Sequence, residues 1–291
     1  MDYRKIIVST DSGCDLNKET LEEKHISFIK MKYFDDNNIY ESNLIDSETV
    51  EFYNKMRNGV VFRTTSVNVN EAYDYLKELA SYGKPILHIA MGSAISGTYN
   101  NFMQAKNMLL SENDKLEIYV MDSLGASISY GILVLEACRL IDEGMEFKDV
   151  IKYLEEYKKG VTPFFTTPTL VYLKRGGRVS NASFFIGNLL SIKPILKLDK
   201  PGRLVIANKI NGIFRAYKRI ALMIKEKVVD ACNQYLYIGH GDCLEKAKEF
   251  AREILQMVKF KGVKYFFIGP TIGSHSGPEL ISAFFHGVER C

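Results

Sequence analysis

The sequence predicts an α/β fold of two domains: an N-terminal Rossmann-like domain with a parallel sheet, and a C-terminal α+β domain with a mainly antiparallel sheet. In the first half, short apolar runs alternate with amphipathic helical patterns, which is typical of a parallel sheet. In the second half, apolar runs follow one another across tight turns, which indicates hairpins. A charged amphipathic segment at residues 146–160 separates the two patterns, so we place the domains at residues 1–158 and 159–291.

Three buried strands are expected in the first half, at residues 4–9, 84–91 and 115–121, because these runs are short, apolar and rich in β-branched residues. Each run ends in small polar residues. The carboxyl ends of the strands form the ligand edge of an open parallel sheet, so this arrangement predicts a binding site there. Helices are expected at residues 70–82 and 98–110, where apolar side chains recur on one face.

The second half contains four runs that predict strands, at residues 161–173, 191–210, 234–242 and 263–274. The turn Lys200-Pro201-Gly202 divides the second run into a hairpin, since proline and glycine favour tight turns. Two amphipathic segments, at residues 212–230 and 242–258, predict helices that pack on this sheet.

The composition excludes several classes of protein. Of the 291 residues, 46% are hydrophobic and 25% are charged, as in an ordinary globular protein. The net charge is only +3 and no long block of like charges occurs, so a nucleic-acid partner is not expected. No run approaches the roughly 18 consecutive apolar residues of a membrane helix, so integral membrane association is not expected. The stretch MDYRKIIVSTDSGCD lacks the pattern of a signal or transit peptide, which predicts a cytoplasmic protein.

No metal and no cofactor is expected. The five cysteines include no CxxC pair, which favours reduced thiols over structural zinc or disulfides. The nucleotide-binding patterns GxxxxGKS/T and GxGxxG are absent. Asp11 and Asp15 do not form the close carboxylate pair that a phosphotransferase requires.

Four short clusters of small hydrogen-bonding residues are the candidate site. They are Thr64-Thr65-Ser66, Ser96-Gly97-Thr98, Gly176-Gly177-Arg178 and Ser274-His275-Ser276-Gly277. Together they offer hydroxyls, one imidazole and one guanidinium to a single anionic group. In a chain rich in Ile, Leu, Phe and Tyr, this combination indicates an amphiphile with a small polar end.

Each cluster has a structural explanation beside the functional one. Ser96 begins a helical pattern, so it is either an N-cap or, with the free N–H groups of that helix end, an anion ligand. The hydroxyls of Thr64, Thr65 and Ser66 precede another helical pattern and by themselves favour a turn and a cap. Arg178 belongs either to a solvated turn or to a fork of donors for a carboxylate or phosphate.

His275 follows an apolar run within a Gly/Ser-rich loop, a setting that favours function over a purely structural role. A serine hydrolase is one alternative, because Ser96, Asp242 and His275 occur in the chain order of α/β-hydrolases. The elbow GxSxG is missing, however, since Ala94 stands where its first glycine would be. A ligand-sensing or protein-interaction module that binds no lipid is a further alternative.

Seven strings, taken in order, resemble the DegV family of bacterial fatty-acid-binding proteins. They are IVSTDSGCDL at 7–16, TTS at 64–66, SAISGTYN at 93–100, VMDS at 120–123, LKRGGRVS at 173–180, GNLLSIKPIL at 187–196 and GSHSGP at 273–278. The resemblance covers essentially the whole chain. It departs from the family pattern at Val67-Asn68, where Gln-Pro is common, at Ser276, where Thr is usual, and at Glu279, where a small residue is usual.

The resemblance implies a non-enzymatic carrier that holds a long-chain fatty acid between two domains. Such a carrier presents the carboxylate to a separate ATP-dependent fatty acid kinase, which makes the acyl phosphate used in fatty acid activation and phospholipid synthesis. On this reading Thr65, Ser96 and His275 bind the carboxylate, and Arg178 contacts the phosphorylated head group or the kinase. Thr64, Gly97 and Ser276 support the head-group loop.

The acyl chain needs an apolar tunnel, and its methylenes supply most of the binding energy at ~0.8 kcal/mol each. The candidates for that lining are Phe164, Phe165, Phe184, Phe185, Ile186, Leu189 and Leu190.

Overall fold

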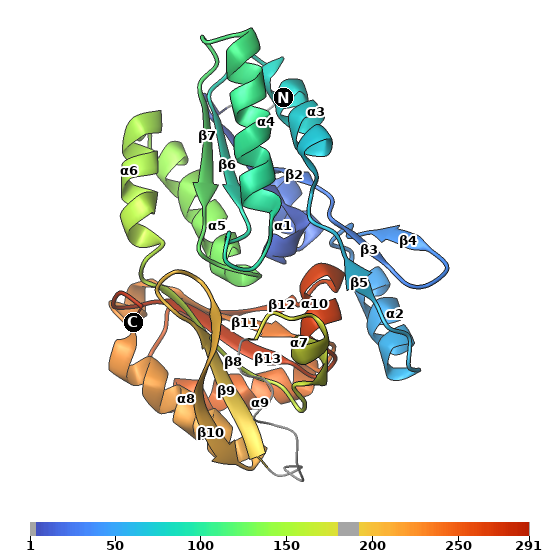
Figure 1. Cartoon of the computed structure of the whole chain (residues 1–291). Coiled ribbons are helices and arrows are strands. Elements are labelled where there is room, and N and C mark those ends of the chain that lie inside the picture. The colour runs from blue at the N-terminus through green and yellow to red at the C-terminus, as the bar shows by residue number, and fades with distance from the viewer. Residues whose placement is uncertain (1–3, 180–191, 291) are drawn as a thin grey trace.

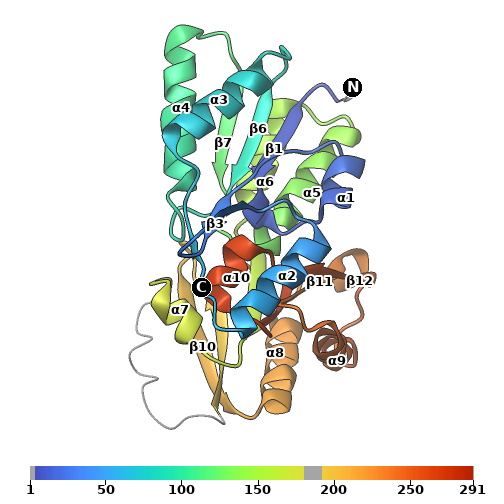
Figure 2. The ribbon, with the colours of Figure 1, turned by 90° about the vertical axis from the view of Figure 1, so that its right-hand side faces the viewer.

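The computed structural model describes residues 4–179 and 192–290, and within them two sheets lie one above the other with a small third sheet at the side (Figures 1 and 2). The first sheet has four strands in the order β2-β1-β6-β7 and the second has six in the order β10-β9-β8-β13-β11-β12. This arrangement confirms the predicted α/β class, with a parallel sheet followed by a mainly antiparallel one.

The first sheet is parallel throughout and consists of β1 (Ile7–Asp11), β2 (Ser27–Ile29), β6 (Ile86–Ala90) and β7 (Ile118–Asp122). Three of its strands have bounds within three residues of the predicted ones. The edge strand β2 was not predicted, because three residues are too short to show a pattern. Helices α1 (Lys18–Glu23), α3 (Val69–Ala80), α4 (Thr98–Glu112), α5 (Ile128–Asp142) and α6 (Phe147–Tyr157) accompany this sheet.

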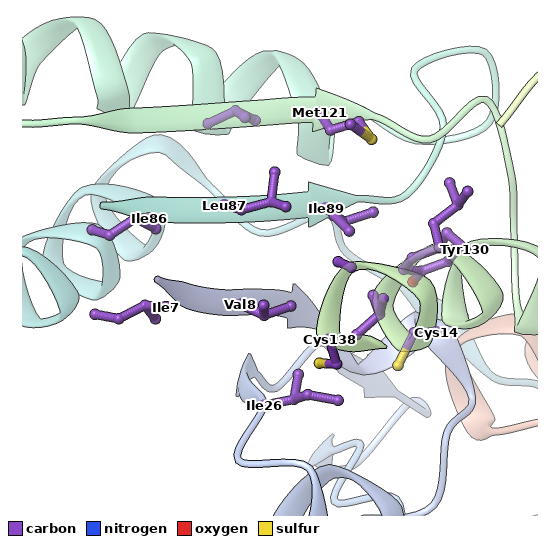
Figure 3. Packing of buried hydrophobic residues seen from close by; sticks show 14 of the residues in the cluster. Ile7, Val8, Cys14, Ile26, Ile86, Leu87, Ile89, Met121, Tyr130 and Cys138 are labelled. Carbon is purple, nitrogen blue, oxygen red and sulfur yellow. The ribbon is translucent and has the colours of Figure 1, made fainter. Parts of the chain in front are cut away.

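The core of this half forms because its central strands are buried along their whole length. Figure 3 shows Val8, Leu87 and Ile89 of neighbouring strands beside Tyr130 and Cys138 of α5. A parallel sheet covered by helices on its faces selects continuous apolar strands of this kind, which is why the sequence revealed them.

A small antiparallel sheet and one helix, which the sequence analysis did not predict, lie between residues 32 and 64. The sheet contains β3 (Lys32–Phe34), β4 (Ile39–Glu41) and β5 (Arg63–Thr64), and the helix is α2 (Asp46–Arg57). An aromatic cluster holds them together: Tyr33, Tyr40, Phe52, Tyr53 and Phe62 pack with ring centroids about 5–6 Å apart.

The second sheet contains β8 (Val161–Thr166), β9 (Ile192–Leu198), β10 (Leu204–Asn211), β11 (Tyr235–His240), β12 (Gly262–Phe267) and β13 (Ile281–His286). All its ladders are antiparallel except the one between β11 and β12. The predicted hairpin is confirmed between β9 and β10, where Gly202 has φ of 89°. Helices α8 (Ile213–Lys227) and α9 (Leu244–Leu255) cover the face turned away from the first sheet (Figure 1).

Two predicted strands were too long. The first ends at Thr166, and Pro168 precedes the short helix α7 (Val171–Arg175). The other ends at Phe267, because Pro270 occupies the first turn of helix α10 (Pro270–Ser276), a position that suits proline. His275 therefore lies in the last turn of a helix and not in a loop, which corrects the sequence-based assignment.

Helix α10 connects the two halves. It lies against α2, α7 and the small sheet (Figure 2). The Tyr53 hydroxyl donates to the Ile268 carbonyl over 2.7 Å, and the Gly269 N–H donates to the Asp15 carboxyl over 3.0 Å. The second sheet begins at Val161, shortly after α6, and the domain limits of 1–158 and 159–291 remain a prediction.

Within the described ranges, no helix combines the length and the apolar character needed to cross a membrane. Among the same residues, no group of three or more His, Cys, Asp or Glu side chains is placed to hold a metal ion.

Candidate functional site

A cavity of about 350 Å³ lies between the two halves of the protein. This volume is at the lower end of the range usual for small-molecule sites. Its apolar wall comes from both halves and contains Met31, Met91, Ile95, Ala126, Pro163, Phe165, Leu173, Leu198, Leu204, Ile268, Ile272, Leu280 and Phe284.

One part of the wall, which we term the polar rim, contains Thr64, Thr65, Ser66, Ser96, Gly97, Arg178, His275 and Ser276. All seven residues predicted for the head-group site are in it. The structure thus brings together four clusters that are separated by up to about two hundred positions in the sequence.

His275 and Thr64 form the closest polar contact of the rim. The Thr64 hydroxyl lies 2.7 Å from Nε2 of His275 and joins the small sheet to α10. Burial, together with the smaller effect of the nearby positive charge of Arg178, lowers the pKa of His275 to about 4. The imidazole is therefore neutral at pH 7, with one nitrogen as donor and the other as acceptor. It can hydrogen-bond a carboxylate but supplies no positive charge.

The His275 ring leaves no room for a side chain at position 176, so glycine is needed there. A Cβ atom at this position would overlap Nδ1 of His275, so the backbone after α7 approaches the imidazole as only glycine permits. Gly277, with φ of 81°, similarly accommodates the ring of Tyr172 from α7. The missing side chains of Gly176 and Gly277 thus allow α7 and α10 to pack closely.

Ser96 combines the two roles that the sequence left open. Its Oγ accepts from the Thr98 backbone N–H at 3.2 Å and lies 2.9 Å from the Thr98 hydroxyl. It thus provides a hydrogen-bond acceptor for a free N–H group in the first turn of α4. The N-cap position itself is Gly97, one residue later than expected. Because Ser96 also lines the cavity, one hydroxyl serves both the helix end and the rim.

The Thr64-Thr65-Ser66 cluster does not cap a helix. Asn68 caps α3 in a reciprocal arrangement with Glu71, which leaves the cluster available to the cavity. Thr65 is exposed, and its hydroxyl has no hydrogen-bond partner among the described residues.

Arg178 is the one permanent cation among the described residues that line the cavity. It is exposed, and its guanidinium donates to the Gly176 carbonyl over 2.5 Å. This position next to His275 gives an anion at the rim a positively charged neighbour.

Asp15, which sequence reasoning set aside, supports the cavity wall from behind. Its carboxyl accepts the Ser127 hydroxyl at 2.5 Å and the Gly269 N–H at 3.0 Å. Burial raises the pKa of Asp15 to about 8, so the carboxyl is mostly protonated at pH 7. Ser127 lines the cavity with φ of 58°, a rare conformation for serine. The polar residues at the end of β1 gave the sequence signal for this part of the site.

The residues of a possible hydrolase triad are engaged elsewhere. Asp242 pairs with Arg57 at 2.5 Å, His275 bonds to Thr64, and Ser96 bonds to Thr98. The described structure contains no hydrogen bond among the three, so the geometry does not support a serine hydrolase.

Of the two candidates for the apolar lining that the structure describes, Phe165 lines the cavity and Phe164 does not. Phe164 points to the opposite face of β8 and packs against α8, because neighbouring strand residues alternate between faces. The other five candidates, Phe184, Phe185, Ile186, Leu189 and Leu190, lie outside the described residues.

Fold and cavity together define a class: a two-domain α/β protein with a mainly apolar cavity and a polar rim between its two halves. The family model described as "uncharacterised protein, DegV family" matches residues 5–287. The chain belongs to the DegV family.

Relatives match along the whole chain. A DegV domain-containing protein of Clostridium perfringens is 34% identical over 286 residues, which cover 98% of each chain. The crystal structure of DegV from Bacillus subtilis, described as a fatty acid binding protein, is 28% identical, with a TM-score of 0.82 over 98% of this chain and 99% of that one. A fatty acid binding DegV family protein from Streptococcus agalactiae is 25% identical, with the same TM-score and coverage.

Proposed function

We propose that this protein binds a long-chain fatty acid, with its carboxylate at the polar rim and its acyl chain in the cavity between the two domains. The observation that carries the proposal is the cavity itself, a mainly apolar space with hydroxyls, an imidazole and a guanidinium gathered on one part of its wall. The fatty acid binding described for two relatives with the same fold supports it.

The physical chemistry of the site suits this ligand. A dozen buried methylenes contribute roughly 10 kcal/mol before the costs of ordering. The hydroxyls of Thr65 and Ser96 and the neutral imidazole of His275 then need only offset the desolvation of one carboxylate, at about 1.5–3 kcal/mol for each charge-assisted hydrogen bond. Thr64, Gly97 and Ser276 shape the rim around these groups.

We further propose that the protein acts in the cytoplasm as a carrier without catalytic activity and presents the carboxylate to a separate ATP-dependent fatty acid kinase. The exposure of Thr65 and Arg178 at the rim supports this role, because a partner can reach the head group there. The acyl phosphate would then enter phospholipid synthesis. We also propose domain limits of 1–158 and 159–291, with residues of both domains at the cavity.

Mass spectrometry of the purified and denatured protein tests the binding function directly. A near-stoichiometric fatty acid is the expected result. No released acid, together with no gain in thermal stability on adding a fatty acid series, would refute the proposal, because a ligand that binds the native state must stabilise it.

Substitutions at the rim test the head-group site. Ser96→Ala and Thr65→Ala should each weaken fatty acid binding by about tenfold while the fold is retained, since each removes one hydrogen bond to the carboxylate. Ser93→Ala is the matched control: Ser93 lies in the same segment as Ser96, but its hydroxyl bonds to Asp122 and does not line the cavity. Unchanged affinity in both rim variants would remove these residues from the site.

A further inference from the structure

The cavity wall contains three hydroxyl side chains beyond the polar rim, from Ser127, Thr271 and Ser282. Two of them are satisfied within the protein. Ser127 donates to Asp15 over 2.5 Å, and Ser282 donates to the Gly239 carbonyl over 3.1 Å. Thr271 is only 4% exposed, and its hydroxyl oxygen is buried without a hydrogen-bond partner among the described residues.

The position of Thr271 in α10 explains why its hydroxyl lacks a partner. Helical serines and threonines usually donate to the carbonyl four residues earlier, as Ser274 and Ser276 do in this helix at 2.7 and 3.0 Å. Thr271 is the second residue of α10, so the corresponding carbonyl belongs to β12. The carbonyl three residues earlier, of Ile268, already accepts the Tyr53 hydroxyl.

Rotation about the Cα–Cβ bond exchanges the methyl and hydroxyl groups of a threonine, and helices permit two of its rotamers. A buried hydroxyl without a hydrogen-bond partner is unfavourable. A ligand oxygen in the cavity would therefore favour the rotamer that turns the Thr271 hydroxyl toward it and forms a hydrogen bond. We propose that Thr271 binds a second polar group of the ligand, and that the cavity accepts fatty acids with an uncharged oxygen substituent, a hydroxyl or ketone, on the acyl chain. This inference rests on the proposed function and names its substrate class.

The surroundings of Thr271 favour a substituent on the chain over the carboxylate itself. Thr271 and His275 are four residues apart on one face of α10, which separates them by ~6 Å along the helix axis. The cation of the rim, Arg178, lies beside His275, whereas the sequence neighbours of Thr271 in the cavity wall, Ile268 and Ile272, are apolar. An anion is thus favoured at the His275 end, and an uncharged group at the Thr271 end.

The test compares Thr271→Val, which keeps the shape but removes the hydroxyl, with wild type. Calorimetry on delipidated protein would measure the dissociation constants of stearic acid and of a series of monohydroxystearic acids that differ in hydroxyl position. We expect wild type to bind at least one hydroxy acid about tenfold more tightly than stearic acid, and Thr271→Val to lose that preference while it retains stearic acid. Ser274→Ala is the matched control, because its hydroxyl bonds to Pro270 on the same helix and does not line the cavity.

Either of two results would overturn the inference: no hydroxy acid preferred by wild type, or a preference that persists in Thr271→Val. Both leave the proposed function standing if stearic acid binds. Failure of wild type to bind any of the acids would instead overturn the proposed function and this inference together.

Discussion

The buried carboxyl of Asp15 should make the protein less stable as the pH rises. Its pKa is raised from 3.8 to about 8, chiefly because burial disfavours the charged form. In the unfolded chain the same group ionises near its ordinary pKa. Between about pH 4 and pH 8 the folded state therefore binds more protons, and the free energy of unfolding falls as the pH increases. Below this window both states are protonated, and above it both are ionised, so the dependence ends.

The size of the effect follows from the shift. Each pH unit within the window changes the free energy of unfolding by about 1.4 kcal/mol, or about 4 kcal/mol from pH 5 to pH 8. Asp15→Asn removes the titration and keeps the geometry, because an amide oxygen can accept from the Gly269 N–H and an amide N–H can donate to the Ser127 oxygen. The stability of Asp15→Asn relative to wild type should thus grow by about 4 kcal/mol over that range.

Urea unfolding followed by circular dichroism at pH 5, 6, 7 and 8 measures this difference. Titrating groups that do not interact with Asp15, such as the buried His88, contribute alike to both proteins and cancel in the comparison. Asp230→Asn, an exposed acid in a left-handed turn that asparagine also tolerates, controls for the loss of a carboxylate. If the difference in the free energy of unfolding between Asp15→Asn and wild type stayed constant across the four pH values, the conclusion that Asp15 is buried and protonated would be refuted.

Three further substitutions test the rim. Gly176→Ala should displace the His275 imidazole, destabilise the protein by about 1–3 kcal/mol and weaken fatty acid binding, as measured by urea unfolding and calorimetry; Gly177→Asn, where no atom lies within 4 Å, is the control. Arg178→Ala should raise the pKa of His275 in an NMR titration, because a positive charge is removed, and should spare lipid binding while impairing turnover with a fatty acid kinase. Full activity with the kinase would exclude Arg178 from that role. Ser96→Ala should lower the free energy of unfolding, measured with urea, by about 1 kcal/mol through loss of the helix-end hydrogen bond.

The sequence by itself determined the elements whose residues are neighbours along the chain. Central strands such as β1 and β6 are buried on both faces and so appear as continuous apolar runs. The β9–β10 hairpin follows from one Pro-Gly turn. The four polar clusters were visible because small hydrogen-bonding residues interrupt apolar stretches, and the resemblance to a family placed them in one site.

Only the tertiary structure decided which of these residues meet and in what state. Thr64 and His275 are 211 positions apart, and no local pattern encodes their 2.7 Å contact. The short strands β2 to β5 and helix α10 are too short for a periodic signal, and packing against the rest of the chain stabilises them. Likewise, the pKa of Asp15 depends on burial between β1 and the loop before α10. Local sequence sets local conformation, whereas long-range packing sets contacts, burial and protonation.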